Sequence, residues 1–262
     1  MVFSWFRSKK KQVFTPEGTI IYAIGDIHGR DDLLAELISI ISQDLIANRH
    51  GKETKMVFLG DYVDRGLGSK MVVDILLILA NEANAAGAWR NTLFLKGNHE
   101  EALLHFLKEP DFGEKWLAHG GTETLISYGV DVPTNSKDGN VWRETANALE
   151  TALGPNHLSF FNNLKSYTEI GDYTFVHAGL RPGKPVEQQS EQDLLWIRGD
   201  FLDSTARFDK KIVHGHTPKK KPFMDYRRIG IDTGAYITGV LTAVRLEGDA
   251  VSFLQTGTDQ AG

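Results

Sequence analysis

The chain has 262 residues, of which 41% are hydrophobic and 24% charged, so it is long and apolar enough to bury a large core. Its formal net charge of −5 argues against a protein that coats nucleic acid, because binding to backbone phosphates needs a strong positive field, and we expect no nucleic-acid partner. The absence of cysteine excludes disulfides, zinc–thiolate sites and any mechanism with a cysteine nucleophile.

The N-terminal residues 1–15 mix aromatic and basic side chains, including Trp5 and Lys9. Such a mixture is compatible with contact to an anionic membrane surface, but chain termini are commonly frayed, and we expect a flexible tail. No apolar run approaches the roughly 20 residues that span a bilayer, and the N-terminus lacks the apolar region of a secretory signal. We therefore expect a cytoplasmic protein without stable membrane association.

The first half of the chain alternates short apolar runs with amphipathic segments. A β-branched run ends at Gly25 and is followed by apolar residues at helical spacing, which predicts a strand, a turn and a helix. The same unit recurs twice, and alternating strands and helices indicate a layered α/β fold. The expected strands are 19–24, 56–59 and 92–95, and the expected helices are 31–46, 69–80 and one that begins near residue 99.

The second half changes from helical to β-rich. Residues from about 112 to 164 are expected to be mostly helical and to form an insertion that caps a site. Gly171 and Asp172 separate two apolar runs, which is a strong hairpin signal. Since no repeat or linker is visible, we expect residues 16–262 to form a single domain. The expected strands are 167–170, 173–176, 212–214, 228–231, 239–246 and 250–254.

Polar residues of the metal-binding type gather directly after the expected strands. In open α/β sheets, ligands bind outside the carboxyl ends of strands, and carboxylate, imidazole and amide oxygen suit Mn²⁺, Fe or Zn²⁺. Taken singly, each cluster is compatible with a turn or a helix cap, but five clusters at five strand ends favour one shared metal site. The clusters are 25–29, 60–66, 97–100, 176–179 and 214–217.

In this order the clusters resemble the signature of the metallophosphoesterase superfamily, and specifically of its phosphoprotein phosphatase branch. The motifs are Gly-Asp-x-His-Gly from Gly25, Gly-Asp-x-Val-Asp-Arg-Gly from Gly60 and Gly-Asn-His-Glu from Gly97, followed by two separate histidines. Segments 194–198 and 216–218, with 231–234, look most like the compact bacterial and phage lambda-type phosphatases. The resemblance implies a four-layer αββα sandwich with mixed sheets and a helical insertion.

The resemblance also implies two divalent cations, for which we expect Mn²⁺, with Fe or Zn²⁺ as alternatives. A solvent molecule held between the two cations would be the nucleophile. The expected ligands are Asp26 and His28 for the first metal, Asp61 as the bridge, and Asn98, His177 and His216 for the second.

Four further residues are expected to take part in proton transfer or in substrate binding. The resemblance implies that His99 protonates the leaving oxygen, and that Asp64 orients His99 and keeps it cationic. Arg65 would bind the phosphoryl oxygens through two parallel N–H donors, and Arg198 is the candidate for a second clamp.

The remaining histidines and a lysine run are given no catalytic role. His214 either hydrogen-bonds a metal ligand or is a satisfied buried histidine. Lysines 219–221 either attract a phosphorylated substrate or form a solvated turn. The histidines not expected to bind metal are His50, His105, His119 and His157.

The resemblance implies a phosphomonoester hydrolase, in first place a serine/threonine protein phosphatase with dual specificity left open. Its partner would be a phosphorylated protein, a peptide or a small phosphoester. The alternative is a symmetrical dinucleoside tetraphosphate hydrolase, or another metallophosphoesterase such as a phosphodiesterase or nuclease. Asp64, Arg65 and Glu100 favour the phosphoprotein branch. Lys96, where eukaryotic enzymes carry arginine, puts eukaryote-like regulatory partners in doubt.

Overall fold

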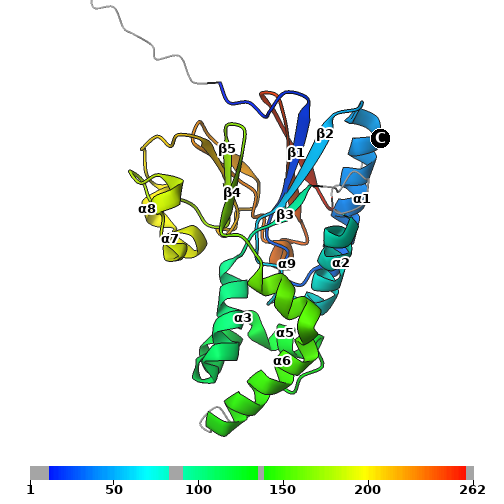
Figure 1. The fold of residues 1–262 in the computed structure, drawn as a ribbon, viewed down its shortest axis with the longest axis vertical. Coiled ribbons are helices and arrows are strands. Elements are labelled where there is room, and N and C mark those ends of the chain that lie inside the picture. Colours follow the sequence, from blue (N-terminus) through cyan, green and yellow to red (C-terminus); the bar gives the residue numbers. More distant parts are fainter. Residues whose placement is uncertain (1–11, 83–90, 135–138, 258–262) are drawn as a thin grey trace, which may run out of the picture.

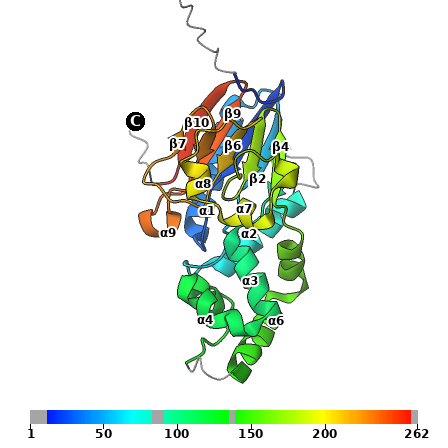
Figure 2. The same ribbon diagram turned by 90° about the vertical axis from the view of Figure 1, so that its left-hand side faces the viewer.

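The computed structural model describes residues 12–82, 91–134 and 139–257. Within these ranges, two five-stranded sheets pack face to face, and helices cover their outer faces (Figure 1). The result is the mixed four-layer αββα sandwich that the sequence predicts. A lobe of helices extends from one end of the sandwich (Figure 2).

The first sheet has the order β10-β9-β1-β2-β3. Its strands β1, β2 and β3 are parallel, and the C-terminal hairpin of β9 and β10 pairs antiparallel with β1. Helices α1 and α2 cover its outer face (Figure 1). The bounds are β1 Thr19–Ile24, α1 Asp31–Asn48, β2 Glu53–Phe58, α2 Ser69–Glu82, β3 Thr92–Phe94, β9 Thr242–Glu247 and β10 Ala250–Gln255.

The second sheet has the order β4-β5-β6-β8-β7. Strands β5, β6 and β8 are parallel, and β4 forms the expected hairpin with β5. Short helices α7 and α8 pack on its outer face. The bounds are β4 Tyr167–Ile170, β5 Tyr173–Val176, η3 Val186–Gln188, α7 Glu191–Trp196, α8 Gly199–Leu202, β6 Lys211–His214, β7 Phe223–Met224 and β8 Arg228–Gly230.

Strand β1 contributes side chains to two hydrophobic clusters, one on each of its faces. Side chains alternate between the faces of a strand, so Tyr22 and Ile24 pack against the helices while Ile21 and Ala23 pack against the second sheet. All of β1 is buried, as expected for a central strand covered on both faces.

The described residues of the segment 112–164 are mostly helical, as the sequence predicts, and helix α3 before it packs in the same lobe. The segment includes a π-helical stretch before α5 and a kink in α6 at Gly154 and Pro155. The bounds are α3 Asn98–Lys108, η1 Pro110–Phe112, α4 Gly113–Trp116, η2 Leu117–Gly121, α5 Thr122–Ser127 and α6 Gly139–Asn162.

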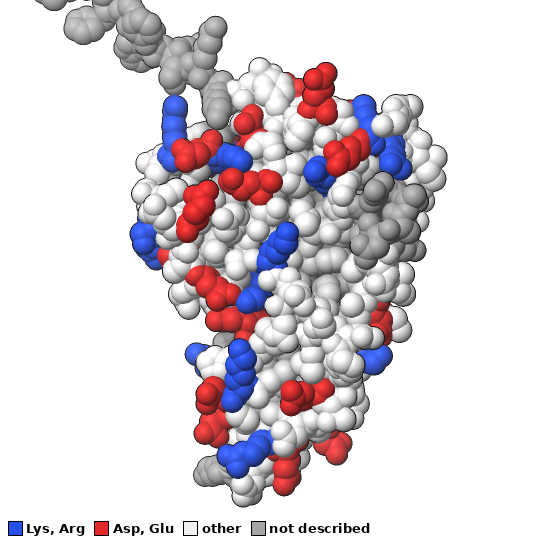
Figure 3. Space-filling view, viewed as in Figure 1, with Lys and Arg blue, Asp and Glu red and all other residues white. Residues whose placement is uncertain are grey.

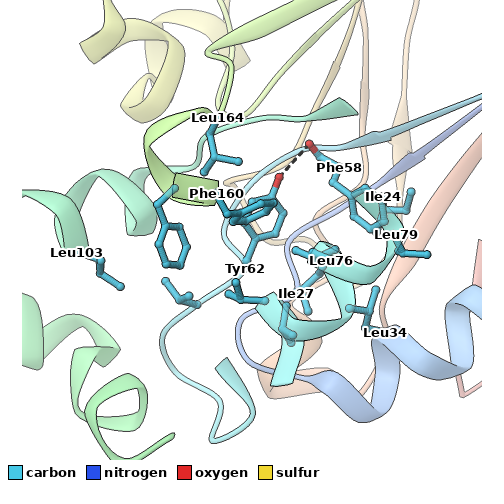
Figure 4. Close-up of a cluster of buried hydrophobic side chains, with 14 of the residues drawn as sticks. Ile24, Ile27, Leu34, Phe58, Tyr62, Leu76, Leu79, Leu103, Phe160 and Leu164 are labelled. Carbon is cyan, nitrogen blue, oxygen red and sulfur yellow. Dashed lines mark hydrogen bonds between the residues drawn. The ribbon is translucent and has the colours of Figure 1, made fainter. Parts of the chain in front are cut away.

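Tyr62 anchors the loop after β2 in the core between the first sheet and its helices. Its ring lies among the buried side chains of that cluster, beside Phe160 (Figure 4). Its hydroxyl lies 2.6 Å from the carbonyl oxygen of Leu95 and 3.3 Å from that of Phe58, to both of which it can donate. This loop carries three of the expected site residues, so their position is set by the core.

Short elements were not predicted from the sequence. These are β7, α7, α8 and a four-residue helix α9, Ala235–Thr238. Most of the tail expected over residues 1–15 lies outside the described residues, but Thr15 is buried and its N–H donates to the carbonyl oxygen of Gly248.

Acidic and basic side chains are interspersed on the face drawn in Figure 3, without one sign dominating. In the described ranges, no helix is both long and apolar enough to cross a membrane.

Candidate dimetal active site

The five polar clusters expected from the sequence meet at one end of the sandwich. The loops after β1, β2 and β3 bring three of them, and the loops after β5 and β6 bring the other two. Because these strands are parallel within each sheet, their carboxyl ends lie at the same edge. The two edges lie next to each other beside the helical lobe, so residues of both sheets share one site (Figure 1).

Three side chains converge on one side of this site. The amide oxygen of Asn98 lies 2.9 Å from His177 Nε2 and 2.8 Å from His216 Nδ1. His177 Nε2 also lies 3.4 Å from Asp61 Oδ2. The expected ligands of the second metal therefore face one another across a few ångströms.

The bridging carboxylate also reaches the other side of the site. Asp61 Oδ2 lies 3.5 Å from His28 Nε2, while His28 Nδ1 faces the carbonyl oxygen of Val63 at 3.0 Å. Asp61 is therefore the member common to two clusters of possible metal ligands, one with His28 and His99 and one with His177 and His216. This is the position that a bridging ligand needs.

Asp26 is held between the two sheets. Both of its carboxylate oxygens accept the backbone N–H of His216, at 3.2 and 3.0 Å. A side chain at Gly215 would place its Cβ 2.0 Å from Asp26 Oδ1, so only glycine permits this approach. All six expected ligands are thus brought together.

The donors present fit divalent cations. His28 and His177 each direct Nδ1 at a backbone carbonyl, which orients Nε2 and its lone pair into the site. His216 directs Nδ1 at the amide oxygen of Asn98, so this nitrogen faces the other donors, while its buried Nε2 has no hydrogen-bond partner among the described residues. Nitrogen and oxygen donors without sulfur suit Mn²⁺, Fe or Zn²⁺.

The protonation states of two histidines suit metal binding. Burial lowers the pKa of His28 to about 3 and, together with the nearby His177, that of His216 to about 2. Both rings are therefore neutral near pH 7. Burial alone would raise the pKa of Asp61, but His177, His99 and His28 hold it well below its usual range. The pKa of His177 shifts in the other direction in the metal-free protein. The negative charge of Asp61 outweighs the effect of burial and raises the pKa of His177 to about 9.

Backbone strain is concentrated in this site. Among the described residues, six non-glycine residues have positive φ between 41° and 70°, a region that side chains disfavour. Five of them are expected site residues, namely His28, Asp61, Asp64, Arg65 and His216. Such strain persists where surrounding contacts enforce it, and it is common at active sites.

Glu100 provides one of these contacts. This buried carboxylate accepts the backbone N–H groups of Asp61 at 2.9 Å, Tyr62 at 2.7 Å and Gly97 at 2.9 Å. It joins the start of α3 to the loop that carries the bridging carboxylate. Glu100, which in the sequence favours the phosphoprotein branch, therefore has a structural role.

Both ring nitrogens of His99 face neighbours outside the expected ligand set. Its Nδ1 lies 2.8 Å from Asp64 Oδ2, and its Nε2 lies 3.1 Å from Arg65 Nη2. Burial would lower the pKa of His99, but Asp61 and Asp64 outweigh burial and raise it. Both ring nitrogens have partners other than the expected metal ligands.

Tyr236 is a site residue that the sequence analysis missed. Arg65 Nη1 donates to its hydroxyl at 2.8 Å, and the Arg65 guanidinium carbon lies 4.6 Å from its ring centre. The ring also contacts His28 edge-on, with 5.2 Å between centres. In the sequence, Tyr236 could have been found only from its position two residues after segment 231–234, which resembles the lambda-type phosphatases.

Arg198 contacts the loop that carries His216. It is exposed, and its Nη1 donates to the carbonyl oxygen of His216 at 3.2 Å. Lysines 219–221, which follow the last ligand loop, are also exposed.

The other histidines have separate partners. His214 is buried, with Nδ1 3.0 Å from the carbonyl oxygen of Gly215, and it accepts from Arg228 at 2.9 Å, which favours the reading as a satisfied histidine. His157 lies between Tyr128 and Asp74.

A profile of the calcineurin-like phosphoesterase family matches residues 20–251. The chain is 25% identical over 242 residues to PrpE of Anoxybacillus flavithermus, an asymmetrical bis(5′-nucleosyl)-tetraphosphatase, with 85% of this chain and 88% of the relative covered. It is 28% identical over 239 residues to PrpE of Halalkalibacterium halodurans, with the same coverage. Its fold resembles a cold-active protein-tyrosine phosphatase of a psychrophilic Shewanella, with TM-score 0.59, 17% identity and coverage of 95% of this chain and 85% of that one.

Proposed function

We propose that this chain, which belongs to the calcineurin-like phosphoesterase family, cleaves dinucleoside tetraphosphates asymmetrically into a nucleoside triphosphate and a nucleoside monophosphate. As a member of that family it is a metal-dependent phosphoester hydrolase. The observation that supports the hydrolytic proposal is the convergence of Asp61 with five other oxygen and nitrogen donors, with His99 and Arg65 beside them. The tetraphosphate substrate is supported by the curated relatives, and it replaces the protein substrate preferred from the sequence.

Two cations would be held by the six converging ligands. Bound there, such cations activate a water molecule for attack and neutralise the charge of the transferred phosphoryl group. A donor set without sulfur suits Mn²⁺, Fe or Zn²⁺, and of these we take Mn²⁺ as the first choice. The proposed ligands are Asp26, His28, Asp61, Asn98, His177 and His216.

The other residues of the site would act on the substrate. Arg65 presents its guanidinium at the site, with Tyr236 and His99 as its neighbours, and can bind phosphoryl oxygens through parallel N–H donors. Arg198, between α7 and α8, contacts the loop of His216 and is exposed, so it could meet a long, charged substrate. His99 can deliver a proton to the departing oxygen, with Asp64 holding its ring.

A protein phosphatase remains the second candidate because of one observation, the buried dyad of Asp64 and His99. A serine or threonine alkoxide is a poor leaving group that needs a proton, whereas a nucleotide leaves as a phosphate and needs protonation far less. A site with a well-held acid is therefore also suited to phosphoserine or phosphothreonine.

A substrate panel tests the proposal. The purified protein with Mn²⁺ is assayed against diadenosine tetraphosphate, a phosphoserine peptide, a phosphotyrosine peptide and a phosphodiester, and kcat/KM is compared because it measures discrimination between substrates. We expect the tetraphosphate to rank first. A phosphopeptide in first place would transfer the proposal to the second candidate.

A further inference from the structure

We propose that Trp116 and Thr124 of the helical insertion are positioning residues for the acid His99 and act on it through Asp64. The inference rests on the acid role proposed above for His99. Neither residue belongs to the strand-end clusters, and both come from the insertion rather than from the sandwich.

Asp64 is bound by the insertion on both carboxylate oxygens. Trp116 Nε1 donates to Oδ2 at 3.0 Å, and this is the oxygen that His99 Nδ1 approaches at 2.8 Å. The Thr124 hydroxyl donates to Oδ1 at 2.6 Å and accepts the Asp64 backbone N–H at 2.9 Å. One donor on each oxygen fixes the plane of the carboxylate, and the carboxylate in turn fixes the imidazole ring.

These contacts are closed to solvent. Asp64 and Thr124 are 0% exposed and Trp116 is 1% exposed, so water cannot replace a lost donor without a rearrangement. The φ angle of Asp64 is 70°, which requires support from its surroundings. Removing one donor should therefore change the orientation of the carboxylate rather than be compensated.

The same segment also holds the neighbouring arginine. The backbone N–H of Arg65 donates to the carbonyl oxygen of Gly120 at 3.0 Å. Gly120 has φ of 111°, and a Cβ there would lie 2.6 Å from Arg65 Cγ. The segment 116–124 thus contacts both the carboxylate that orients the acid and the backbone of the proposed phosphate clamp.

Packing within the insertion sets the direction of the Trp116 indole. Its ring stacks on Phe106 with 4.8 Å between centres, and a Cβ at Gly121 would lie 2.5 Å from it. The indole N–H is therefore aimed at Asp64 by the insertion's own core.

The test compares variants that delete one donor with matched controls in the same lobe. Trp116→Phe and Thr124→Val remove the donors to Asp64. Trp142→Phe and Thr145→Val are the controls, because Trp142 packs edge-on against the same Phe106 ring and the Thr145 hydroxyl bonds within its own helix. Each variant is assayed on phenyl phosphate, whose leaving group needs a proton, and on p-nitrophenyl phosphate, whose leaving group does not.

We expect kcat on phenyl phosphate to fall about 10-fold in Trp116→Phe and Thr124→Val, because the Asp64 carboxylate loses a hydrogen-bond donor. The fall of kcat on p-nitrophenyl phosphate should be less than about 3-fold. The controls should keep the wild-type ratio of the two rates. Adding Trp116→Phe to Asp64→Asn should cost little more, because both act through one carboxylate. Equal losses on both substrates, or additive losses in the double variant, would overturn the proposal.

A measurement without substrate separates this inference from the proposed function. The indole N–H resonance that Trp116→Phe removes should shift in Asp64→Asn, and no shift would contradict the contact. If Asp64→Asn leaves the ratio of aryl phosphate rates unchanged, the acid role itself fails. Aryl phosphates report on the acid whether or not a dinucleotide is the substrate, so failure of the tetraphosphate assay leaves this test intact.

Discussion

The amide oxygen of Asn98 lies 2.9 Å from Nε2 of His177, although one residue follows the first sheet and the other follows the second. Both side chains are buried where the carboxyl ends of the two sheets meet. A cation bound between them would connect the two sheets, so metal binding should stabilise the whole sandwich.

The first prediction concerns this stabilisation. Mn²⁺ at 100 times its Kd should stabilise the fold by about 2.7 kcal/mol, because a ligand that binds only the folded state shifts the equilibrium by mass action. A thermal melt with Mn²⁺ and with chelator measures the shift. Asn98→Ala should reduce it, whereas the control Asn162→Ala, on the exposed surface of α6, should not. An unchanged shift in Asn98→Ala would remove Asn98 from the ligand set.

The second prediction concerns pH. In the metal-free protein the raised pKa of His177, about 9, keeps a proton on the ring, and a cation must displace it. Metal affinity should therefore rise with pH between 7 and 9, by up to about tenfold per unit. His28 and His216 are already neutral there and should add no dependence. Burial and the nearby Asp232 also raise the pKa of the ligand Asp26, so Asp26 is a second group from which a cation can displace a proton. Calorimetry in two buffers of different ionisation enthalpy should detect proton release on metal binding, and none released would be incompatible with His177 as a ligand.

The third prediction concerns Tyr236. Its hydroxyl and ring both contact Arg65, so Tyr236→Phe should raise KM about 3-fold and Tyr236→Leu more, with a smaller effect on kcat. Steady-state kinetics on the preferred substrate measures this. Tyr226→Phe is the matched control, because Tyr226 is exposed and its ring contacts Arg227 instead. A purely kcat effect would mean that Tyr236 does not act through substrate binding.

The fourth prediction separates an acid from a ligand at His99. His99→Asn should retain both metals by elemental analysis, while kcat on a phosphoserine peptide falls by roughly 10² to 10⁴. The loss on diadenosine tetraphosphate should be smaller, since its leaving group needs less protonation. His105→Asn, on the same helix and stacked on Phe112, is the control. Loss of a metal in His99→Asn would make His99 a ligand.

The fold and the meeting of the five polar clusters could be predicted because both depend on short sequence patterns. Strand β1 is a continuous apolar run, and each cluster lies within a few residues of the end of a strand, such as His28 after β1. The assignment of the six residues as metal ligands stays a prediction. Tyr236, Trp116 and Thr124 could not be predicted, because their partners lie 171, 52 and 60 residues away. The four residues of α9 have no periodicity long enough to detect.

Substrate preference was the least predictable property. In the sequence Glu100 favours the phosphoprotein branch, but its carboxylate holds the loop of Asp61, which cleavage of any of these substrates would require. Likewise, the roles proposed for Asp64 and Arg65, to orient an acid and to bind a phosphate, would suit both esters and anhydrides.

The products of diadenosine tetraphosphate test the central claim most directly. With Mn²⁺, anion-exchange chromatography of the reaction should resolve ATP and AMP in equal amounts, and chelator or Asp61→Asn should abolish both. Formation of two ADP molecules, or turnover that persists in Asp61→Asn without metal, would contradict an asymmetrical, metal-dependent cleavage centred on Asp61.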